Sequence, residues 1–169
     1  MSAKPIPVPT REARPDFETF FRAEYPTLVR MLFLMTGDSA EAEEIAQEAL
    51  ARAFERWRRV REMESPGGYV CRTALNLNRK RIRRLGVRAR KVLAPGYRDA
   101  IEAAEQRSDV ARALAALPVG QREAVVMTEW LDLSAEEAGV ILRIEAASVR
   151  SQASRGRAAL RQQLEDHDD

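Results

Sequence analysis

Apolar residues recur along most of this chain at the three- and four-residue spacing of amphipathic helices, and no stretch of useful length alternates as a strand would. The first helical segment is expected to begin after Asp16, which can cap it, and to end at Gly37. Its apolar positions are Phe17, Phe20, Phe21, Leu28, Met31, Leu32 and Met35. Pro26 is expected to bend or divide this segment, because proline has no backbone N–H to donate.

Two further helices are expected in the first half of the chain. Asp38 and Glu41 have the spacing of a capping box and predict a helix that ends near Arg59. Its predicted buried residues are Ala42, Ile45, Ala46, Ala49, Leu50, Ala53 and Trp57. After a break at Ser65-Pro66-Gly67-Gly68, a third helix is expected over residues 69–85. Its predicted buried residues are Val70, Ala74, Leu77 and Leu85.

The second half of the chain restarts the helical pattern at Asp109 and interrupts it at Pro118, which is expected to open the next helix at its first position. Ser134 and Glu137 form a second capping box, which predicts a short helix that ends at Leu142. A brief turn and a last helix over residues 146–164 follow. This order is typical of a helix-turn-helix, whose second helix enters the major groove of DNA, although plain helical bundles also contain such pairs.

The pattern therefore predicts an all-α fold of two small helical bundles joined by a linker, the second containing the helix-turn-helix. The expected division is a disordered lead-in at 1–14, a first domain at 15–85, a linker at 86–108, a second domain at 109–164 and an acidic tail at 165–169. Each bundle has only about 60–80 residues, so each core is expected to be marginal by itself.

Charge is distributed unevenly, although 28 basic and 26 acidic residues nearly cancel to a net charge of +2. Residues 52–91 carry 14 basic and 3 acidic side chains, and residues 146–161 carry four arginines and no acid. The remaining segments are net acidic. Two basic segments set among acidic ones favour two contacts with a nucleic acid over an ordinary solvated surface, which would pair more of its cations with acids.

The same composition argues against several other classes of protein. The single cysteine, Cys71, permits no internal disulfide, and the single histidine, His167, lies next to an acidic C-terminus. Catalytic triads and multi-histidine metal sites are therefore not expected, nor is any cofactor. The longest apolar run, residues 31–35, is too short to cross a membrane, and no signal peptide is evident. We expect a soluble cytoplasmic protein that is not an enzyme.

Two helices carry candidate nucleic-acid contacts. On the third helix, one amide and three cations share a face: Asn76, Arg79, Lys80 and Arg83. Such a face suits a nucleic-acid strand, since cations follow phosphates and an amide can contact a base edge. On the last helix, the packing face is predicted to be Val149, Ala153, Gly156, Leu160 and Leu164. Its polar flanks are Ser148, Ser151, Gln152 and Arg155 on one side, and Arg150, Ser154, Arg157 and Arg161 on the other.

Two sets of motifs occur in order along the chain. The first comprises Leu34-Met-Thr-Gly-Asp-Ser-Ala-Glu-Ala-Glu-Glu-Ile-Ala-Gln-Glu-Ala-Leu50, Arg52-Ala-Phe54 and the run from Tyr69 to Asn76. The second comprises Leu114-Ala-Ala-Leu-Pro118, Gln121-Arg-Glu-Ala-Val125, Leu133-Ser134, Ser148-Val-Arg-Ser151 and Arg155-Gly-Arg-Ala-Ala-Leu160. With these motifs the chain resembles the short, two-domain sigma factors of bacterial RNA polymerase, the extracytoplasmic-function type. The first set matches their region two and the second their region four.

The resemblance implies a non-catalytic subunit that binds the β′ and β subunits of core RNA polymerase and directs it to promoter DNA, with an anti-sigma factor as a further partner. It implies that the acidic motif docking on the coiled coil of β′ is Glu44, Gln47 and Glu48. The implied contacts to the −10 element are Tyr69, Asn76, Arg79, Lys80 and Arg83, beside a loop at 61–69 that holds a flipped base. The implied contacts to the −35 element are Ser148, Arg150, Ser151, Gln152 and Arg155.

Some positions depart from the family pattern. Glu44 stands where the family usually has Asp, Phe54 where it often has Trp, and Trp57 where it often has Leu. Arg143 and Glu145 replace the usual Gly and Ser of the helix-turn-helix turn. The segment Gln152-Ala153-Ser154 replaces a commoner Arg-Leu-His, which affects the expected −35 preference.

Three other functions are compatible with parts of the sequence. A helix-turn-helix regulator that binds DNA without core polymerase would account for the second half of the chain. It would not explain the acidic helix or the basic face of the third helix. A sigma-like protein that has lost polymerase binding is compatible with the altered positions. An enzyme acting on nucleic acid would need convergent acids or an activated nucleophile, whereas the acids here cluster at helix starts, where they favour capping.

Overall fold

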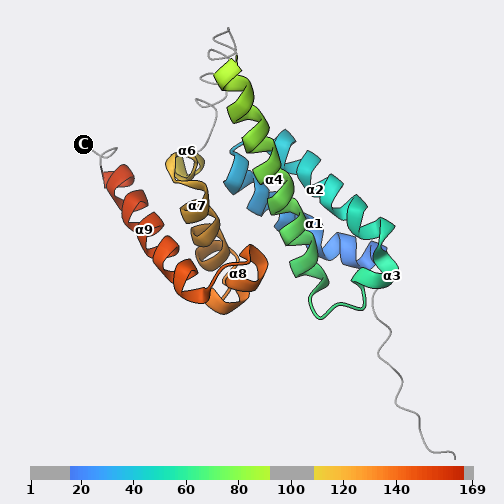
Figure 1. Ribbon diagram of the computed structural model, residues 1–169. Coiled ribbons are helices and arrows are strands. Elements are labelled where there is room, and N and C mark those ends of the chain that lie inside the picture. Colours follow the sequence, from blue (N-terminus) through green and yellow to red (C-terminus); the bar gives the residue numbers. More distant parts are fainter. Residues whose placement is uncertain (1–15, 92–108, 166–169) are drawn as a thin grey trace, which may run out of the picture.

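The computed structural model describes residues 16–91 and 109–165, and the regular elements within those ranges are all helices (Figure 1). The first segment, residues 16–91, contains α1 (Phe17–Thr36), α2 (Ser39–Glu55), α3 (Trp57–Val60) and α4 (Pro66–Lys91). The second segment, residues 109–165, contains α6 (Asp109–Ala116), α7 (Val119–Val125), the π-helical turn η1 (Val126–Trp130), α8 (Ala135–Leu142) and α9 (Ala146–Glu165). The predicted all-α class is confirmed. The lead-in, most of the linker and the last tail residues lie outside the described ranges.

Helix α1 begins and ends where the sequence predicts. The Asp16 carboxylate accepts a hydrogen bond from the Thr19 N–H at 2.8 Å, and Gly37 closes the helix with a left-handed φ of 72°. The expectation of a division of this segment at Pro26 is wrong, because α1 continues through that residue. Pro26 lies on the exposed side of the helix, where water can satisfy the carbonyl that the proline leaves unbonded.

Helix α2 keeps its predicted buried face but ends earlier than predicted. The Asp38 carboxylate accepts from the Glu41 N–H at 2.9 Å, and the six alanine, isoleucine and leucine positions predicted for the core are all buried. The helix stops at Glu55, because Arg56 leaves helical geometry with φ −115° and ψ 20°. Trp57 therefore lies in the short α3, half-buried, in a T-shaped contact with Phe17 at a centroid distance of 5.3 Å.

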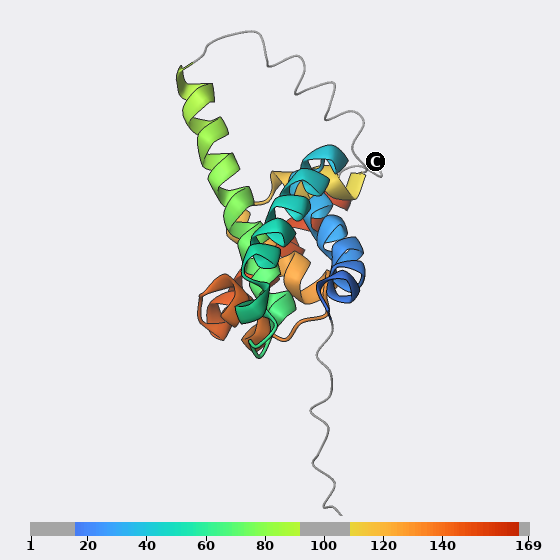
Figure 2. The ribbon, with the colours of Figure 1, turned by 90° about the vertical axis from the view of Figure 1, so that its right-hand side faces the viewer.

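Helix α4 is longer than predicted at both ends. Ser65 Oγ accepts from the Gly68 N–H at 3.0 Å, so the expected break at Ser65-Pro66 is instead a capped helix start, with Pro66 at the first position. The last turns of α4 extend past the other helices in two perpendicular views (Figure 2). Leu85 is 53% exposed there, so its predicted burial is wrong. Leu75 and Asn78 are buried on α4 in addition to Val70 and Ala74.

The second segment contains the predicted helix-turn-helix. Pro118 caps α7 rather than occupying its first position, and the Ser134–Glu137 capping box is complete. Arg143 adopts the left-handed conformation, with φ 59°, that usually favours glycine. The turn also needs Gly139 on α8, since a Cβ there would lie 2.8 Å from the Ile144 carbonyl oxygen. None of the helices in the described ranges is both long enough and apolar enough to span a membrane.

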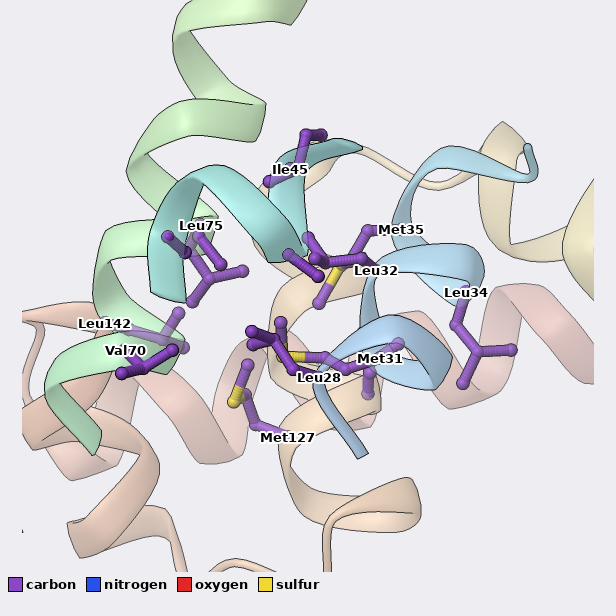
Figure 3. Packing of buried hydrophobic residues seen from close by; sticks show 14 of the residues in the cluster. Leu28, Met31, Leu32, Leu34, Met35, Ile45, Val70, Leu75, Met127 and Leu142 are labelled. Atoms are coloured by element: carbon purple, nitrogen blue, oxygen red, sulfur yellow. The ribbon is translucent and has the colours of Figure 1, made fainter. Parts of the chain in front are cut away.

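The two segments pack against each other around one continuous hydrophobic core, which the sequence pattern does not indicate. Met127 of η1 lies against Leu28 and Met31 of α1, and Leu142 of α8 lies beside Val70 of α4 (Figure 3). We call this contact between the first and second segments the seam. The marginal size of each bundle gives a physical reason for it, because joining the two cores buries more apolar surface than either bundle buries alone.

Candidate nucleic-acid and protein interfaces

The candidate basic face of α4 is divided by the seam. Asn76, Lys80 and Arg83 are exposed, as expected for groups that contact a strand. Arg79 instead reaches across the seam to Glu123 of α7. Its Nε donates to Glu123 Oε1 at 2.8 Å and its Nη2 donates to Oε2 at 2.5 Å. The hydrogen bonding of Arg79 to the Glu123 carboxylate is the main reason that the pKa of Arg79 lies above its usual value.

The segment before Tyr69 borders a groove at the seam. Tyr69 itself is half-buried against the core, and its carbonyl oxygen accepts from Thr73 Oγ1 at 2.8 Å. The groove has a volume of about 280 Å³. Its lining from the first segment includes Glu24, Ser65, Gly67, Gly68 and Cys71, and its lining from the second segment is Leu131, Leu133 and Ile141. Two segments far apart in the sequence therefore line one groove beside Ser65, Gly67 and Gly68, in the stretch that is expected to hold a flipped base. The last part of that stretch, from Pro66 on, belongs to α4 rather than to a loop.

Two titratable groups in this groove are shifted by their surroundings. Burial raises the pKa of the Glu24 carboxyl. Burial, reinforced by the negative charges of Glu24 and Glu123, raises the pKa of the Cys71 thiol to about 12. The Cys71 Sγ lies 3.4 Å from the Met31 Sδ. Cys71 is thus a half-buried residue whose thiol stays protonated at neutral pH.

We expect Cys71 to resist thiol reagents in the folded protein. A pKa of about 12 leaves far less reactive thiolate at pH 8 than an ordinary cysteine has, so modification by Ellman's reagent is expected to be at least about a hundredfold slower than in the urea-unfolded chain. The time course of absorbance at pH 8 measures both rates. Equal rates would contradict the burial of this thiol at the seam.

The acidic residues of α2 lie on its outer face. The Glu44 side chain is 72% exposed, and Gln47 and Glu48 are exposed beside it. Glu48 pairs with Arg52 of its own helix at 2.6 Å, and Arg81 of α4 contacts both Glu41 and Glu44, the latter at 3.4 Å. Arg81 thereby fixes one edge of this face against α4. The face suits a basic protein surface, because its remaining acidic oxygens point to solvent.

Helix α9 presents most of its candidate residues to solvent. Its predicted packing residues Val149, Ala153 and Gly156 are buried, and the exposed candidates are Ser148, Arg150, Ser151 and Arg155. Arg150 pairs with Glu136 of α8 at 2.9 Å, and Arg155 donates to Ser151 Oγ at 2.6 Å. Gln152 is not fully exposed like these residues, because its half-buried side chain packs against α7. Its amide nitrogen lies 3.3 Å from the position that a Cβ of Gly120 would occupy.

Sequence reasoning missed the polar residues that cross the seam. Glu123 is 2% exposed, Arg72 of α4 donates to the carbonyl oxygens of Val140 and Ile141 at 2.6 and 3.2 Å, and Arg122 donates to the Met35 carbonyl oxygen at 2.6 Å. One signal was present for Glu123, since it directly precedes the apolar run at 124–127. The arginines gave none, because the partners that they reach across the seam are backbone carbonyls of helices far away in the sequence.

Most of the chain matches known protein families and relatives. The profile described as Sigma-70 region 2 matches residues 20–88, and the profile described as Sigma-70, region 4 matches residues 107–160. The RNA polymerase sigma-E factor of Streptomyces coelicolor is 30% identical over 154 residues, which cover 88% of this chain and 86% of that protein. The ECF RNA polymerase sigma factor SigW of Bacillus subtilis is 30% identical over 156 residues, which cover 82% of this chain and 83% of that protein.

Solved structures share the fold. The sigma factor RpoE of Bartonella quintana, in complex with the anti-sigma factor NepR, has a TM-score of 0.73 at 20% identity, over 89% of this chain and 97% of that chain. CnrH, in complex with the cytosolic domain of CnrY, has a TM-score of 0.64 at 22% identity, over 90% of this chain and 89% of that chain. The two region profiles, in order, and the relatives matched over most of their length show that this chain belongs to the extracytoplasmic-function (ECF) type of the sigma-70 family of RNA polymerase sigma factors.

Proposed function

We propose that this chain binds core RNA polymerase and directs it to promoters, and that it performs no chemistry itself. The observation that carries the proposal is the match of both sigma-70 regions to one chain that presents an exposed acidic face on α2 and exposed basic positions on α4 and α9. A protein that must hold an enzyme and DNA together needs surfaces of both signs. The acids serve the polymerase and the cations serve phosphates.

Each surface receives one role. Glu44, Gln47 and Glu48 dock on the β′ subunit, and the second segment contacts the β subunit. On α4, Tyr69, Asn76, Arg79, Lys80 and Arg83 hold the opened −10 strand. On α9, Ser148, Arg150, Ser151 and Arg155 contact the −35 duplex, and Gln152 joins them by swinging away from α7. Ten of these thirteen side chains are exposed, which supports these roles; Tyr69, Arg79 and Gln152 are half-buried.

A regulatory partner and a location belong to the same proposal. The two structural neighbours, RpoE of Bartonella quintana and CnrH, were each solved with a protein partner, which for RpoE is described as an anti-sigma factor. We propose that this chain also has an anti-sigma factor, and that it acts in the cytoplasm, where RNA polymerase and promoter DNA are found.

Replacing Asn76 by alanine tests the assignment of the −10 strand. Asn76 is exposed on α4 and is not part of the acidic face of α2, so Asn76→Ala is expected to lower open-complex formation by about tenfold, the cost of one good base contact. Permanganate footprinting of the opened strand measures that loss. Co-elution with core polymerase in gel filtration should stay unchanged.

A matched control is Gln162→Ala, which removes an exposed amide near the end of α9 and should leave both measurements unchanged. If Asn76→Ala abolished core binding instead of strand opening, its assigned role would be wrong. If the wild-type chain did not co-elute with core polymerase, the proposed function itself would fail.

A further inference from the structure

The groove between the two segments contains a carboxylate without a partner. Glu24 of α1 lines this groove and is half-buried. Within residues 16–91 and 109–165, its side chain makes no hydrogen bond and no ion pair, and burial is the cause that raises its pKa. A partly desolvated carboxylate gains most from a cation that also donates hydrogen bonds. The groove therefore offers a binding position for such a group.

The Glu24 carboxylate lies against the first turn of α4. A Cβ added to Gly67 would lie 3.0 Å from Glu24 Oε2 and 3.1 Å from Oε1, so glycine at this position leaves the carboxylate room beside the helix. The neighbouring Gly68 N–H already donates to Ser65 Oγ at 3.0 Å. Among the described residues, both Glu24 oxygens thus remain available as acceptors at the wall of the groove.

The rest of the groove is largely apolar and comes from both segments. Its large apolar side chains are Leu28, Met31, Leu131, Leu133 and Ile141. Ile141 reaches the α4 wall, since its Cγ1 would lie 3.9 Å from a Cβ at Gly68. The volume of about 280 Å³ is close to the lower end of the range of about 300–1,000 Å³ that small-molecule sites occupy. The groove thus has the size and the mixed lining of a site for a small organic molecule.

The charges around the groove select the kind of molecule. Glu24 and Glu123 both act on the Cys71 thiol as negative charges, and Arg72 is the positive charge that acts on it. The Nε and Nη2 of Arg72 donate to carbonyl oxygens of α8, so these two donors are engaged there rather than with Glu24. An anion would be repelled by the carboxylate, and a neutral molecule would leave it without a counter-charge. An ammonium group supplies both the charge and the donors.

We propose that the groove binds a small primary amine, whose ammonium group pairs with Glu24 and whose apolar body lies against Leu28, Leu133 and Ile141. An ammonium has three N–H donors, and the two Glu24 oxygens and the Thr27 hydroxyl at the same groove are acceptors for them. The apolar body replaces water along the aliphatic lining. This site is separate from the proposed polymerase and DNA contacts of Glu44, α4 and α9, and it does not depend on the proposed function.

Titration of the ¹⁵N-labelled, full-length chain with phenethylamine tests the proposal. The amide resonances of Gly67 and Gly68, which line the groove, should shift and saturate. An amine of about nine non-hydrogen atoms is expected to bind with a Kd in the millimolar range or tighter. The neutral isostere 2-phenylethanol should bind at least about tenfold more weakly, because it loses the charged hydrogen bonds to Glu24.

Two pairs of variants locate the site. Glu24→Gln keeps the size of the side chain and should weaken phenethylamine binding by at least about tenfold, whereas Glu18→Gln, which changes an exposed acid of the same helix, should not change it. Ile141→Ala should weaken binding by at least about fivefold, because it removes apolar contact area. Val140→Ala, at a 68% exposed position beside it, is the matched control and should have no effect. Far-UV circular dichroism checks that each variant is folded.

Several outcomes would overturn the proposal. No saturable shift of Gly67 and Gly68 up to about 20 mM phenethylamine would show that the groove is not an amine site. Equal binding of 2-phenylethanol, or unchanged binding to folded Glu24→Gln, would show that the carboxylate plays no part. Tighter binding of deoxythymidine than of phenethylamine would assign the groove to a nucleobase instead. Co-elution of the chain with core polymerase tests the sigma function separately, and none of these titrations bears on that result.

Discussion

Replacing Met127 by alanine is expected to lower the free energy of unfolding by about 2–5 kcal/mol. Met127 is fully buried, and it extends from the second segment toward Leu28 of the first in the shared core (Figure 3). Alanine would remove most of this side chain and leave a cavity where the two segments meet. Because small domains have total stabilities of only about 5–15 kcal/mol, this loss is a large fraction of the whole.

Urea unfolding, followed by tryptophan fluorescence, measures this effect and reports on each segment. The chain has one tryptophan in each segment, Trp57 in α3 and Trp130 in η1, so single Trp→Phe variants follow the two separately. In the wild type, both reporters should unfold at the same urea concentration, because one core joins the segments. Met127→Leu, which nearly conserves volume, should cost less than about 1.5 kcal/mol. Two separate transitions in the wild type would contradict a shared core.

Reversing the charge of Glu44 and Glu48 is expected to weaken binding to core polymerase by more than about a hundredfold, since like charges facing each other at an interface cost several kcal/mol. Both side chains lie on the exposed face of α2, so lysines fit there without disturbing the core. Transcription should fall in parallel, because a sigma factor that does not bind polymerase cannot deliver it. Binding is measured by titrating the labelled chain with core polymerase.

The matched control places the same charge change elsewhere. Glu18→Lys with Glu64→Lys reverses two exposed acids outside α2, and should leave core binding within about twofold of the wild type, because distant surface charges are screened at physiological salt. Equal losses in both double variants would show that net charge, rather than the acidic face of α2, governs binding. That result would remove Glu44 and Glu48 from the polymerase contact.

Features fixed by neighbouring residues could be predicted from the sequence. Asp16 and Ser134 cap their helices because the side chain and the N–H that it accepts lie three residues apart. The buried face of α2 follows from the helical period alone. The exposure of Asn76 and Lys80 follows in the same way, since the opposite face of α4 supplies Val70 and Ala74 to the core.

Features that depend on the seam could not be predicted. Arg79 and Glu123 are 44 residues apart, and either alone has the pattern of an exposed charged residue. Leu85 was expected in the core because it continues the apolar period of α4, but the helix extends past its neighbours there, and the described parts of the chain leave this side chain exposed. Periodicity shows which face of a helix is apolar, and the length of the partner helices decides how much of that face is buried.

Transcription with purified core polymerase tests the central claim most directly. The chain is added to core polymerase and a library of promoter fragments, and the 5′ ends of the transcripts are sequenced. We predict initiation from fragments that share two sequence elements, and no such initiation from core polymerase alone or with the Glu44→Lys/Glu48→Lys variant. Sequence-specific DNA binding by the chain, without affinity for core polymerase and without transcripts, would contradict the account and favour a helix-turn-helix regulator.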